Sequence, residues 1–325
     1  MKILILACLI SILLTYICIK ITLPILKRKK AGQTILHYVE AHKEKNGTPT
    51  MGGLFFILPS VLVYFIFSPN RISGVAVAIG LAFMVVGFID DFIKIKFNQN
   101  EGLKAYQKII FQFAIAIVAG VFCYINGITL CHIPFFKENI DFGIFTIPFV
   151  ALIFIAITNC VNLTDGLDGL ASSVSSVYLI ILTILIGLQL KTFEYMYLKT
   201  DEYFSLQTLS CALVGGLLGF LIFNSSKAKI FMGDTGSLSL GGFIGSISIF
   251  SSNSLFIPII GIMFVLTGIS VIIQVVYFKA TKKRVFLMAP LHHHFQLKGK
   301  TETQISYSYA LITLMVGLCC LFVYI

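Results

Sequence analysis

Charged residues are scarce in this sequence. Asp, Glu, Lys and Arg make up only 12% of its 325 residues, whereas soluble domains carry about 25%. Apolar residues account for 58%, and the mean hydropathy is +0.96. This composition excludes a single soluble core. It predicts a polytopic integral membrane protein in which residues 1–325 form one transmembrane domain.

Two other patterns are missing. The eight cysteines include no Cys-x-x-Cys pair and lie mostly inside or beside apolar runs, so we interpret them as buried, inert thiols. No Ala-x-Ala-like cleavage site follows the first apolar segment, which is long enough to span a bilayer and is followed by basic residues. We therefore interpret residues 2–23 as a membrane helix and not as a signal peptide.

A helix needs roughly 20 apolar residues to cross a bilayer, and ten segments of the chain are candidates. They are residues 2–23, 51–67, 74–93, 106–126, 144–161, 172–190, 206–224, 237–251, 255–278 and 305–325. Glycine and serine interrupt the eighth segment, which makes it the weakest of the set. The expected fold is all-α with about ten transmembrane helices, and both termini then lie on the same side of the membrane.

Lysine and arginine decide the orientation, because cytoplasmic loops are enriched in them. Of the 24 basic residues, 18 lie in or beside the odd-numbered connections: Lys27, Arg28, Lys29, Lys30, Lys43, Lys45, Lys94, Lys96, Lys104, Lys108, Lys227, Lys229, Lys279, Lys282, Lys283, Arg284, Lys298 and Lys300. We therefore expect these connections in the cytoplasm and both termini outside. This bias accounts for the net charge of +10 without a nucleic-acid partner. Basic inner loops also attract anionic membrane lipids or phosphorylated substrates.

One outer connection has a pattern of its own. Residues 127–147, GITLCHIPFFKENIDFGIFTI, partly alternate between apolar and polar residues around Lys137-Glu138-Asn139. This alternation predicts a small external β-hairpin.

Every unusual polar cluster falls on the predicted cytoplasmic side, beginning with GFIDDFIK at the end of the third segment. Counted from Gly74, Asp90 lies about 24 Å along the helix, near the inner headgroup level. A charge near hydrocarbon is costly unless it is paired or faces water. Lys94 or Lys96 could neutralise Asp90 and Asp91 in a structural salt bridge. Adjacent carboxylates more often meet a cation or a proton.

The third and fourth inner loops carry further acids. In NCVNLTDGLDGLASS, four polar residues recur at three-residue spacing: Asn159, Asn162, Asp165 and Asp168. A helix cap explains one acid but not four polar groups in register, which favours a functional role. In FNSSKAKIFMGDTGS, Asp234 stands between Gly233 and Thr235-Gly236. Backbone exposed by glycine can approach a phosphate there, while the carboxylate can hold a metal.

The first and fifth inner loops are less specific by themselves. The stretch KNGTPTMGG, residues 45–53, is explained by a turn and a helix start with Thr50 as the N-cap. APLHHHFQLKGK contains His292, His293 and His294. Consecutive histidines cannot all ligate one metal as a helical i, i+4 pair does, so zinc is weakly supported. Imidazole groups directed at phosphate oxygens fit the basic surroundings better.

Together these loops place carboxylates, asparagines, lysines and histidines at one membrane face. Hard oxygen ligands favour Mg²⁺, usually shared with substrate phosphates. We therefore expect the paired aspartates to help bind or activate a phosphorylated substrate at the inner leaflet. The alternative from another class is a secondary transporter. Transporters place ionisable groups near the bilayer midplane, commonly in repeated halves, whereas here no repeat is apparent.

The motifs GFIDDFIK, NLTDGLDGLA, FMGDTGSL and APLHHHF occur in that order and resemble those of the polyprenyl-phosphate N-acetylhexosamine-1-phosphate transferases over the whole chain. GTPTMGG and the triple histidine narrow the resemblance to the phospho-N-acetylmuramoyl-pentapeptide transferases. Gln296 departs from the Glu that this family usually has. The resemblance implies an enzyme of the bacterial cytoplasmic membrane that transfers phospho-MurNAc-pentapeptide from UDP-MurNAc-pentapeptide to undecaprenyl phosphate. The products would be lipid I and UMP, in the first membrane step of peptidoglycan synthesis.

The resemblance also implies Mg²⁺, a homodimer and roles for individual residues. Asp234 would be the principal Mg²⁺ ligand, while Asp90 and Asp91 would serve the lipid phosphate, the metal or proton transfer. The histidine loop would contact the sugar nucleotide. The implied nucleoside pocket comprises Asn162, Asp165, Gly166, Leu167, Asp168 and Phe231, the last of which could stack on uracil. Leu163 is a further substrate-binding residue that the resemblance implies. The implied helpers in substrate binding are Lys45, Thr50, Lys94, Asn224 and Gln274.

Two alternatives stay open at this point. A phosphate monoester is largely dianionic at pH 7, because its second pKa is near 6. This favours direct attack by the lipid phosphate, although a covalent aspartyl-phosphate intermediate is also compatible with the sequence. A related transferase that carries another UDP-N-acetylhexosamine is the nearest alternative enzyme, and the triple histidine argues against it.

Overall fold

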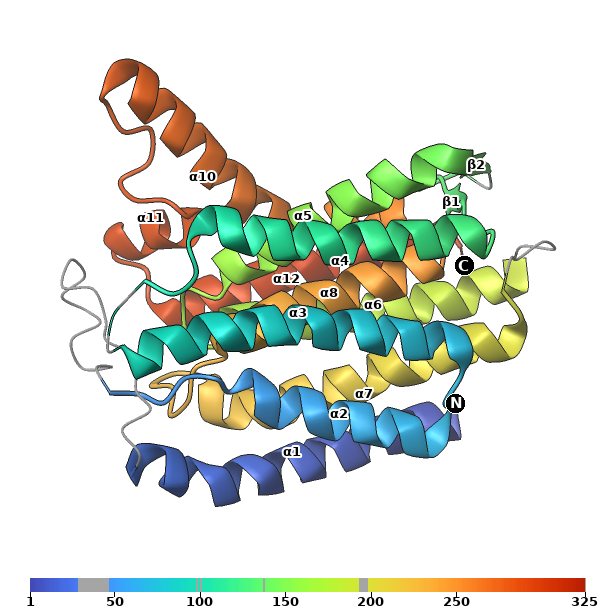
Figure 1. Ribbon diagram of the computed structural model, residues 1–325, viewed down its shortest axis with the longest axis horizontal. Coiled ribbons are helices and arrows are strands. Elements are labelled where there is room, and N and C mark those ends of the chain that lie inside the picture. Colours follow the sequence, from blue (N-terminus) through green and yellow to red (C-terminus); the bar gives the residue numbers. More distant parts are fainter. Residues whose placement is uncertain (29–46, 98, 100, 137, 193–197, 325) are drawn as a thin grey trace.

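The computed structural model describes every residue except 29–46, 98, 100, 137, 193–197 and 325. The described part is almost entirely helical (Figure 1). The α-helices are α1 (Lys2–Arg28), α2 (Gly53–Phe67), α3 (Arg71–Lys96), α4 (Ala105–Ile125), α5 (Thr146–Thr164), α6 (Leu170–Thr192), α7 (Thr200–Asn224), α8 (Gly233–Phe250), α9 (Ile257–Ile260), α10 (Ile262–Thr281), α11 (Leu291–Leu297) and α12 (Glu302–Phe322). Short 3-10 turns, η2 (Gly143–Phe145) and η3 (Ser254–Phe256), precede α5 and α9.

Among the described residues, eight helical segments are long and apolar enough to cross a membrane: α1, α3, α4, η2 with α5, α6, α7, α10 and α12. This confirms the predicted class of polytopic helical membrane protein. The other two predicted segments, 51–67 and 237–251, correspond to α2 and α8. They are not among the eight, because α2 has only 15 residues and α8 is rich in glycine and serine.

The ninth predicted segment, 255–278, is not one continuous helix. η3 and the short α9 occupy its first part, and Gly261 separates α9 from α10. A Cβ atom at Gly261 would lie 2.6 Å from the carbonyl oxygen of Ile257, so the chain is packed too tightly here for a side chain. The second half of α10 projects from the bundle (Figure 1).

α8 forms the core of the bundle, and α3 and α5 pack against it. Its residues from Thr235 to Phe250 are all buried. Glycine permits the close approach, since a Cβ at Gly242 would lie 2.7 Å from the ring of Phe83. The hydroxyl of Ser239 donates to the carbonyl of Gly80 at 2.8 Å. The small residues that made this segment the weakest candidate span therefore suit a helix surrounded by protein and not by lipid.

The predicted hairpin is present. Strands β1 (Leu130–His132) and β2 (Asn139–Asp141) pair antiparallel, with Cys131 opposite Ile140. In Figure 1 the hairpin lies at the same end of the bundle as both termini, whereas the connection from α3 to α4 lies at the other end. That second end carries the polar clusters.

Candidate active site

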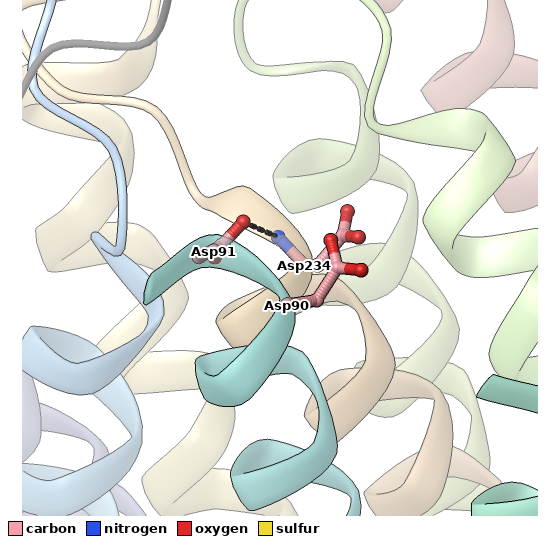
Figure 2. Close-up of side chains that lie close together, drawn as sticks. All are labelled: Asp90, Asp91 and Asp234. Carbon is pink, nitrogen blue, oxygen red and sulfur yellow. Dashed lines mark hydrogen bonds between the residues drawn. The ribbon is translucent and has the colours of Figure 1, made fainter. Parts of the chain in front are cut away.

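Three carboxylates converge at the end of the bundle where α3 passes into α4 (Figure 2). Asp90 and Asp91 stand near the end of α3, and Asp234 stands in the first turn of α8. One oxygen from each of the three lies within 4.8 Å of the others. Asp90 and Asp91 are buried, and Asp234 is half-buried. The packing of α3 on α8 thus joins two motifs that lie 143 residues apart.

Asp91 binds the start of α8. Its Oδ1 accepts a hydrogen bond from the backbone N–H of Asp234 at 3.2 Å. Its Oδ2 accepts from the backbone N–H of Thr235 at 2.9 Å and from the Thr235 hydroxyl at 2.7 Å. The first N–H groups of a helix have no partner within the helix and favour a negative charge. Asp91 therefore caps α8 from a neighbouring helix, and this contact positions Asp234.

Asp90 binds the connection between α3 and α4. Its Oδ1 accepts a hydrogen bond from the backbone N–H of Leu103 at 2.7 Å. The chain comes so close that a Cβ atom at Gly102 would lie 2.4 Å from the same oxygen. Asp90 thus has one structural contact, while Lys94 Nζ lies 2.6 Å from its Oδ2 and Lys108 Nζ lies 3.0 Å from its Oδ1.

Two ammonium groups lie among the three carboxylates. Lys94 Nζ is 2.6 Å from Asp90 Oδ2, 3.1 Å from Asp234 Oδ2 and 3.7 Å from Asp91 Oδ1. Lys108 Nζ, from the first turn of α4, is 3.0 Å from Asp90 Oδ1 and 2.5 Å from Asp234 Oδ2. Lys108 is a site residue that the sequence motifs did not predict. One feature of the sequence could have identified it: Lys108 lies at the inner end of an apolar segment, at the level of Asp90.

The salt bridge considered for the aspartate pair exists for Lys94 but not for Lys96. Lys96 instead lies over the rings of Phe92 and Phe97, with its Nζ 6.0 and 5.7 Å from their centroids. The reason is helical spacing, because Lys94 follows Asp90 by four residues and shares its face.

Asp234 is in contact with several other residues of the site. Asn162 Nδ2 donates to Asp234 Oδ1 and to the hydroxyl of Ser237, both at 2.8 Å. Lys94 Nζ and Lys108 Nζ also lie beside the Asp234 carboxylate, and their positive charges favour its ionised form.

The donor set suits a hard divalent cation. Mg²⁺ prefers carboxylate oxygens and usually shares its shell with water and substrate phosphates. Asp90 and Asp234 each have an oxygen directed at the lysines, whereas both oxygens of Asp91 already accept hydrogen bonds from α8. Three carboxylates against two ammonium groups leave an excess of negative charge in the cluster. The fit of these residues to a metal ion is thus good, with Asp234 and Asp90 the better placed ligands.

The chain matches known proteins along most of its length. The model of glycosyl transferase family 4 matches residues 73–252, and a phospho-N-acetylmuramoyl-pentapeptide-transferase signature matches residues 45–57. A phospho-N-acetylmuramoyl-pentapeptide-transferase from Caldanaerobacter subterraneus subsp. tengcongensis is 40% identical over 311 residues, covering 95% of both chains. A relative of the same name from Clostridium novyi is 39% identical over 323 residues, 98% of this chain and 96% of the relative. One from Clostridioides difficile is 41% identical over 315 residues, 95% of this chain and 94% of the relative.

The chain belongs to the phospho-N-acetylmuramoyl-pentapeptide-transferase family.

The segment matched by the transferase signature pairs with the loop that precedes α8. The backbone N–H of Phe231 donates to the carbonyl of Pro49, and the N–H of Gly52 donates to the carbonyl of Phe231, both at 2.8 Å. The ring of Phe231 is half-buried. Thr50 is buried, and its hydroxyl has no hydrogen-bond partner among the described residues. Lys45, also expected to help bind substrate in a transferase, lies outside the described residues.

Two residues with roles implied by the transferase resemblance stabilise loops: Asp168 of the nucleoside pocket and Asn224, a helper in substrate binding. Asp168 Oδ2 accepts from the backbone N–H of Ala228 at 2.9 Å, and the N–H of Asp168 donates to Glu302 Oε2 at 3.0 Å. Asn224 Nδ2 donates to the carbonyl of Ile230 at 3.0 Å. The contacts with Ala228 and Ile230 hold residues 225–232, the segment that contains Phe231. Asp168 and Asn224 thus stabilise the segment on which Phe231 lies.

Asp165 follows the last residue of α5 and is half-buried. Burial raises its pKa well above the usual range, and the charges of Asp234, Asp91 and Asp168 raise it further. Two nearby leucines differ in exposure, since Leu167 in the same loop is buried and Leu163 near the end of α5 is half-buried.

The three histidines of the transferase motif lie on the segment after α10, and they differ from one another. His292 is buried against Gly166, where a Cβ atom would lie 2.3 Å from His292 Nε2. Neither of its ring nitrogens has a hydrogen-bond partner among the described residues. His293 Nδ1 lies 3.1 Å from Gln296 Oε1, and His294 Nδ1 accepts from the backbone N–H of Leu287 at 3.1 Å.

Gln274 has a structural contact. Its Oε1 accepts from the backbone N–H of Phe286 at 2.9 Å, which holds the histidine segment to α10. The structure therefore brings five of the expected residues into direct contact: Asp90, Asp91, Lys94, Asn162 and Asp234. His292 packs against Gly166 of the third inner loop, next to Asp165. Gln274, Asn224 and Asp168 hold the surrounding segments.

Proposed function

We propose that this protein transfers phospho-MurNAc-pentapeptide from UDP-MurNAc-pentapeptide to undecaprenyl phosphate, giving lipid I and UMP. Membership of the transferase family supports this proposal. The structural observation that supports it best is the cluster of Asp90, Asp91, Asp234, Lys94 and Lys108 at one end of an apolar bundle. A soluble diphosphate and a membrane-bound phosphate can meet at such a place.

The residues of the site would act mainly by positioning and by charge. Phosphoryl transfer requires stabilisation of negative charge more than covalent chemistry from the protein. Lys94 and Lys108 would bind phosphate oxygens, and Asn162 would keep the Asp234 carboxylate oriented toward them. The lipid phosphate is already largely dianionic at pH 7. Asp90 therefore has only to orient it or accept a residual proton. We favour this direct attack over an aspartyl-phosphate intermediate.

A divalent metal is part of the proposal. Asp234 would be its principal ligand, with Asp90 and Asp91 as the further candidates, and Mg²⁺ is the ion that oxygen ligands and a diphosphate substrate favour. When bound, Mg²⁺ would neutralise charge on the diphosphate. Asp91 would contribute chiefly by capping α8, because that contact fixes where the Asp234 carboxylate lies.

The membrane arrangement is proposed from the charge bias. We infer ten spans, with both termini outside and the carboxylate cluster at the cytoplasmic face of the bacterial inner membrane. Two of these ten spans would be α2, which is short, and α8, which is less apolar and is enclosed by protein. A homodimer is proposed from the family resemblance.

Substrate comparison tests the function. Purified protein would be incubated with Mg²⁺, undecaprenyl phosphate and one of several UDP-N-acetylhexosamines, and both UMP and the lipid product would be measured. We expect products only with UDP-MurNAc-pentapeptide. Faster turnover with another UDP-sugar would favour a related transferase. The absence of UMP release with every substrate, in protein shown to be folded, would contradict the enzyme assignment.

A further inference from the structure

α10 leaves the bundle along its second half (Figure 1). Its first half is anchored, since Met263, Phe264, Thr267 and Ser270 are buried. Beyond Val271 the large apolar side chains are 43–64% exposed, and they are Ile272, Ile273, Val275, Val276, Tyr277 and Phe278. A helix that is apolar all round is stable where protein or hydrocarbon surrounds it. In this half of α10 the surrounding medium is therefore the acyl chains of the membrane.

Four cations follow this apolar stretch. They are all exposed and fall within six positions: Lys279, Lys282, Lys283 and Arg284. Figure 1 shows the far end of α10 at the same end of the bundle as the connection from α3 to α4. In the proposed orientation this end lies at the level of the inner phospholipid headgroups. Long basic side chains at that level extend toward lipid phosphates.

Among the described residues, no carboxylate pairs with this cluster. The sequence has no Asp or Glu between Asp234 and Glu302. Throughout the described part of the chain, no salt bridge involves any of the four cations. Arg284 Nη1 donates to the neutral carbonyl of Leu287 at 3.2 Å. Because neighbouring cations repel one another, the cluster favours a surface that supplies anions.

We propose that residues 279–284 bind the headgroups of anionic phospholipids and that this contact holds the end of α10 at the membrane surface. The flanking residues fit this position, because Val285 and Leu287 are 46% and 50% exposed and would lie at the boundary between headgroups and acyl chains. The contact is independent of the proposed transfer reaction, so the two proposals can fail separately.

The chain contains no tryptophan, so Val285→Trp places a single indole fluorophore beside the cluster. The full-length variant would be placed in phosphatidylcholine nanodiscs that contain either brominated phosphatidylglycerol or brominated phosphatidylcholine at the same fraction. Bromine quenches tryptophan only at contact, so the difference in quenching measures local enrichment of the anionic lipid. We expect about tenfold enrichment around residue 285, and we expect it to decrease at high salt.

Two charge variants in the Val285→Trp background complete the test. The enrichment should disappear when all four cations of the cluster are replaced: Lys279→Gln, Lys282→Gln, Lys283→Gln and Arg284→Gln. The control removes the same charge from four exposed lysines elsewhere and should retain the enrichment: Lys227→Gln, Lys229→Gln, Lys298→Gln and Lys300→Gln.

Three outcomes would overturn the proposal. Equal quenching by the two brominated lipids in the Val285→Trp protein would exclude a headgroup site. An equal loss of enrichment in the control variant would show that only total charge matters. Displacement of phosphatidylglycerol from the label by an equimolar amount of undecaprenyl phosphate would assign the cluster to the carrier lipid instead of to phospholipids.

Discussion

The carboxylate of Asp91 accepts hydrogen bonds from the backbone amides of Asp234 and Thr235 and from the hydroxyl of Thr235. Asp91 therefore holds the helix turn on which Asp234 stands. The two aspartates have different partners, since Asp234 faces Lys94 and Lys108. Substitution of each by asparagine should accordingly give different defects.

Asp234→Asn removes one charge with little change in volume. Lys94 and Lys108 retain Asp90 as a partner, so we expect the variant to fold and its unfolding temperature to change little. Turnover should fall about 100-fold or more, the usual effect of losing one electrostatic contact in a site of this kind. The Mg²⁺ concentration for half-maximal activity should rise. A normal Mg²⁺ midpoint together with substantial turnover would remove Asp234 from the proposed metal site.

Asp91→Asn should affect stability first. The amide cannot accept all the hydrogen bonds that the carboxylate accepts from α8, and loss of such a cap costs about 2 kcal/mol. We expect a lower unfolding temperature than in Asp234→Asn, reduced turnover and a smaller change in the Mg²⁺ midpoint. Thermal unfolding and Mg²⁺ titrations of both variants provide the comparison. Unchanged stability with a large shift in Mg²⁺ dependence would make Asp91 a metal ligand instead.

Gly233→Ala should disturb the same site through the backbone. Gly233 has a φ of +72°, and a Cβ there would lie 2.4 Å from Asp91 Oδ2 and 2.7 Å from the Thr50 hydroxyl. The left-handed backbone costs about 1–2 kcal/mol for alanine, and the clash moves Asp91 away from α8. Turnover should therefore fall by about tenfold or more.

The control for this substitution is Gly127→Ala. Gly127 has the same φ of +72° but nothing within 4 Å of a Cβ atom. It should show comparable backbone strain with nearly normal turnover. Equal activity in the two alanine variants would mean that the clash at Gly233 has no effect on the site.

Phe231→Ala and Asp168→Ala should weaken binding of the UDP-substrate more than binding of the lipid phosphate. Base stacking is worth roughly 1–3 kcal/mol, so Phe231→Ala should raise the KM for the nucleotide sugar about tenfold. Asp168→Ala releases the N–H of Ala228 and loosens the segment that carries Phe231. Both KM values would be measured for each variant. If neither variant changes the KM for the nucleotide sugar, the pocket lies elsewhere.

His292 predicts a pH dependence of stability. Burial lowers its pKa to about 3, with a further contribution from the charge of His293, whereas an unfolded histidine has a pKa of about 6.5. Between these values the unfolded state binds the proton and the folded state does not, so stability is lost as the pH falls below about 6.5. From pH 7 to pH 5 this amounts to about 2 kcal/mol. The stability of His292→Leu should depend less on pH in this range, as measured by chemical unfolding at several pH values. An unchanged slope would indicate a charged imidazole in the folded protein.

Topology has its own test. Cysteine placed at Lys283 or Lys199 in a cysteine-free variant would be treated in intact cells with a membrane-impermeant thiol reagent. Because of the positive-inside bias, we expect labelling at position 199 and protection at position 283 until the membrane is opened. Strong labelling of position 283 in intact cells would reverse the proposed orientation.

The sequence by itself determined the class of the protein and the residue types of its site. Apolar length and the scarcity of charge required membrane helices, and the acids of three inner loops were identifiable because such groups are costly near hydrocarbon. The hairpin was also predictable, since alternation over a few residues is a local pattern. Each of these signals depends only on neighbours along the chain.

The tertiary structure decided which of those residues meet and what each one contacts. The α3–α8 packing turned Asp91 into a helix cap, and the adjoining α4 placed Lys108 beside Asp234. The tertiary structure also divided the ninth predicted segment at Gly261. It enclosed α8 in protein, and the glycines and serines of α8 are unfavourable only for a helix that faces lipid. These features arise from contacts between residues far apart in the sequence. The chemistry of the site residues can be read from the sequence, but the distances between these residues depend on how the helices pack.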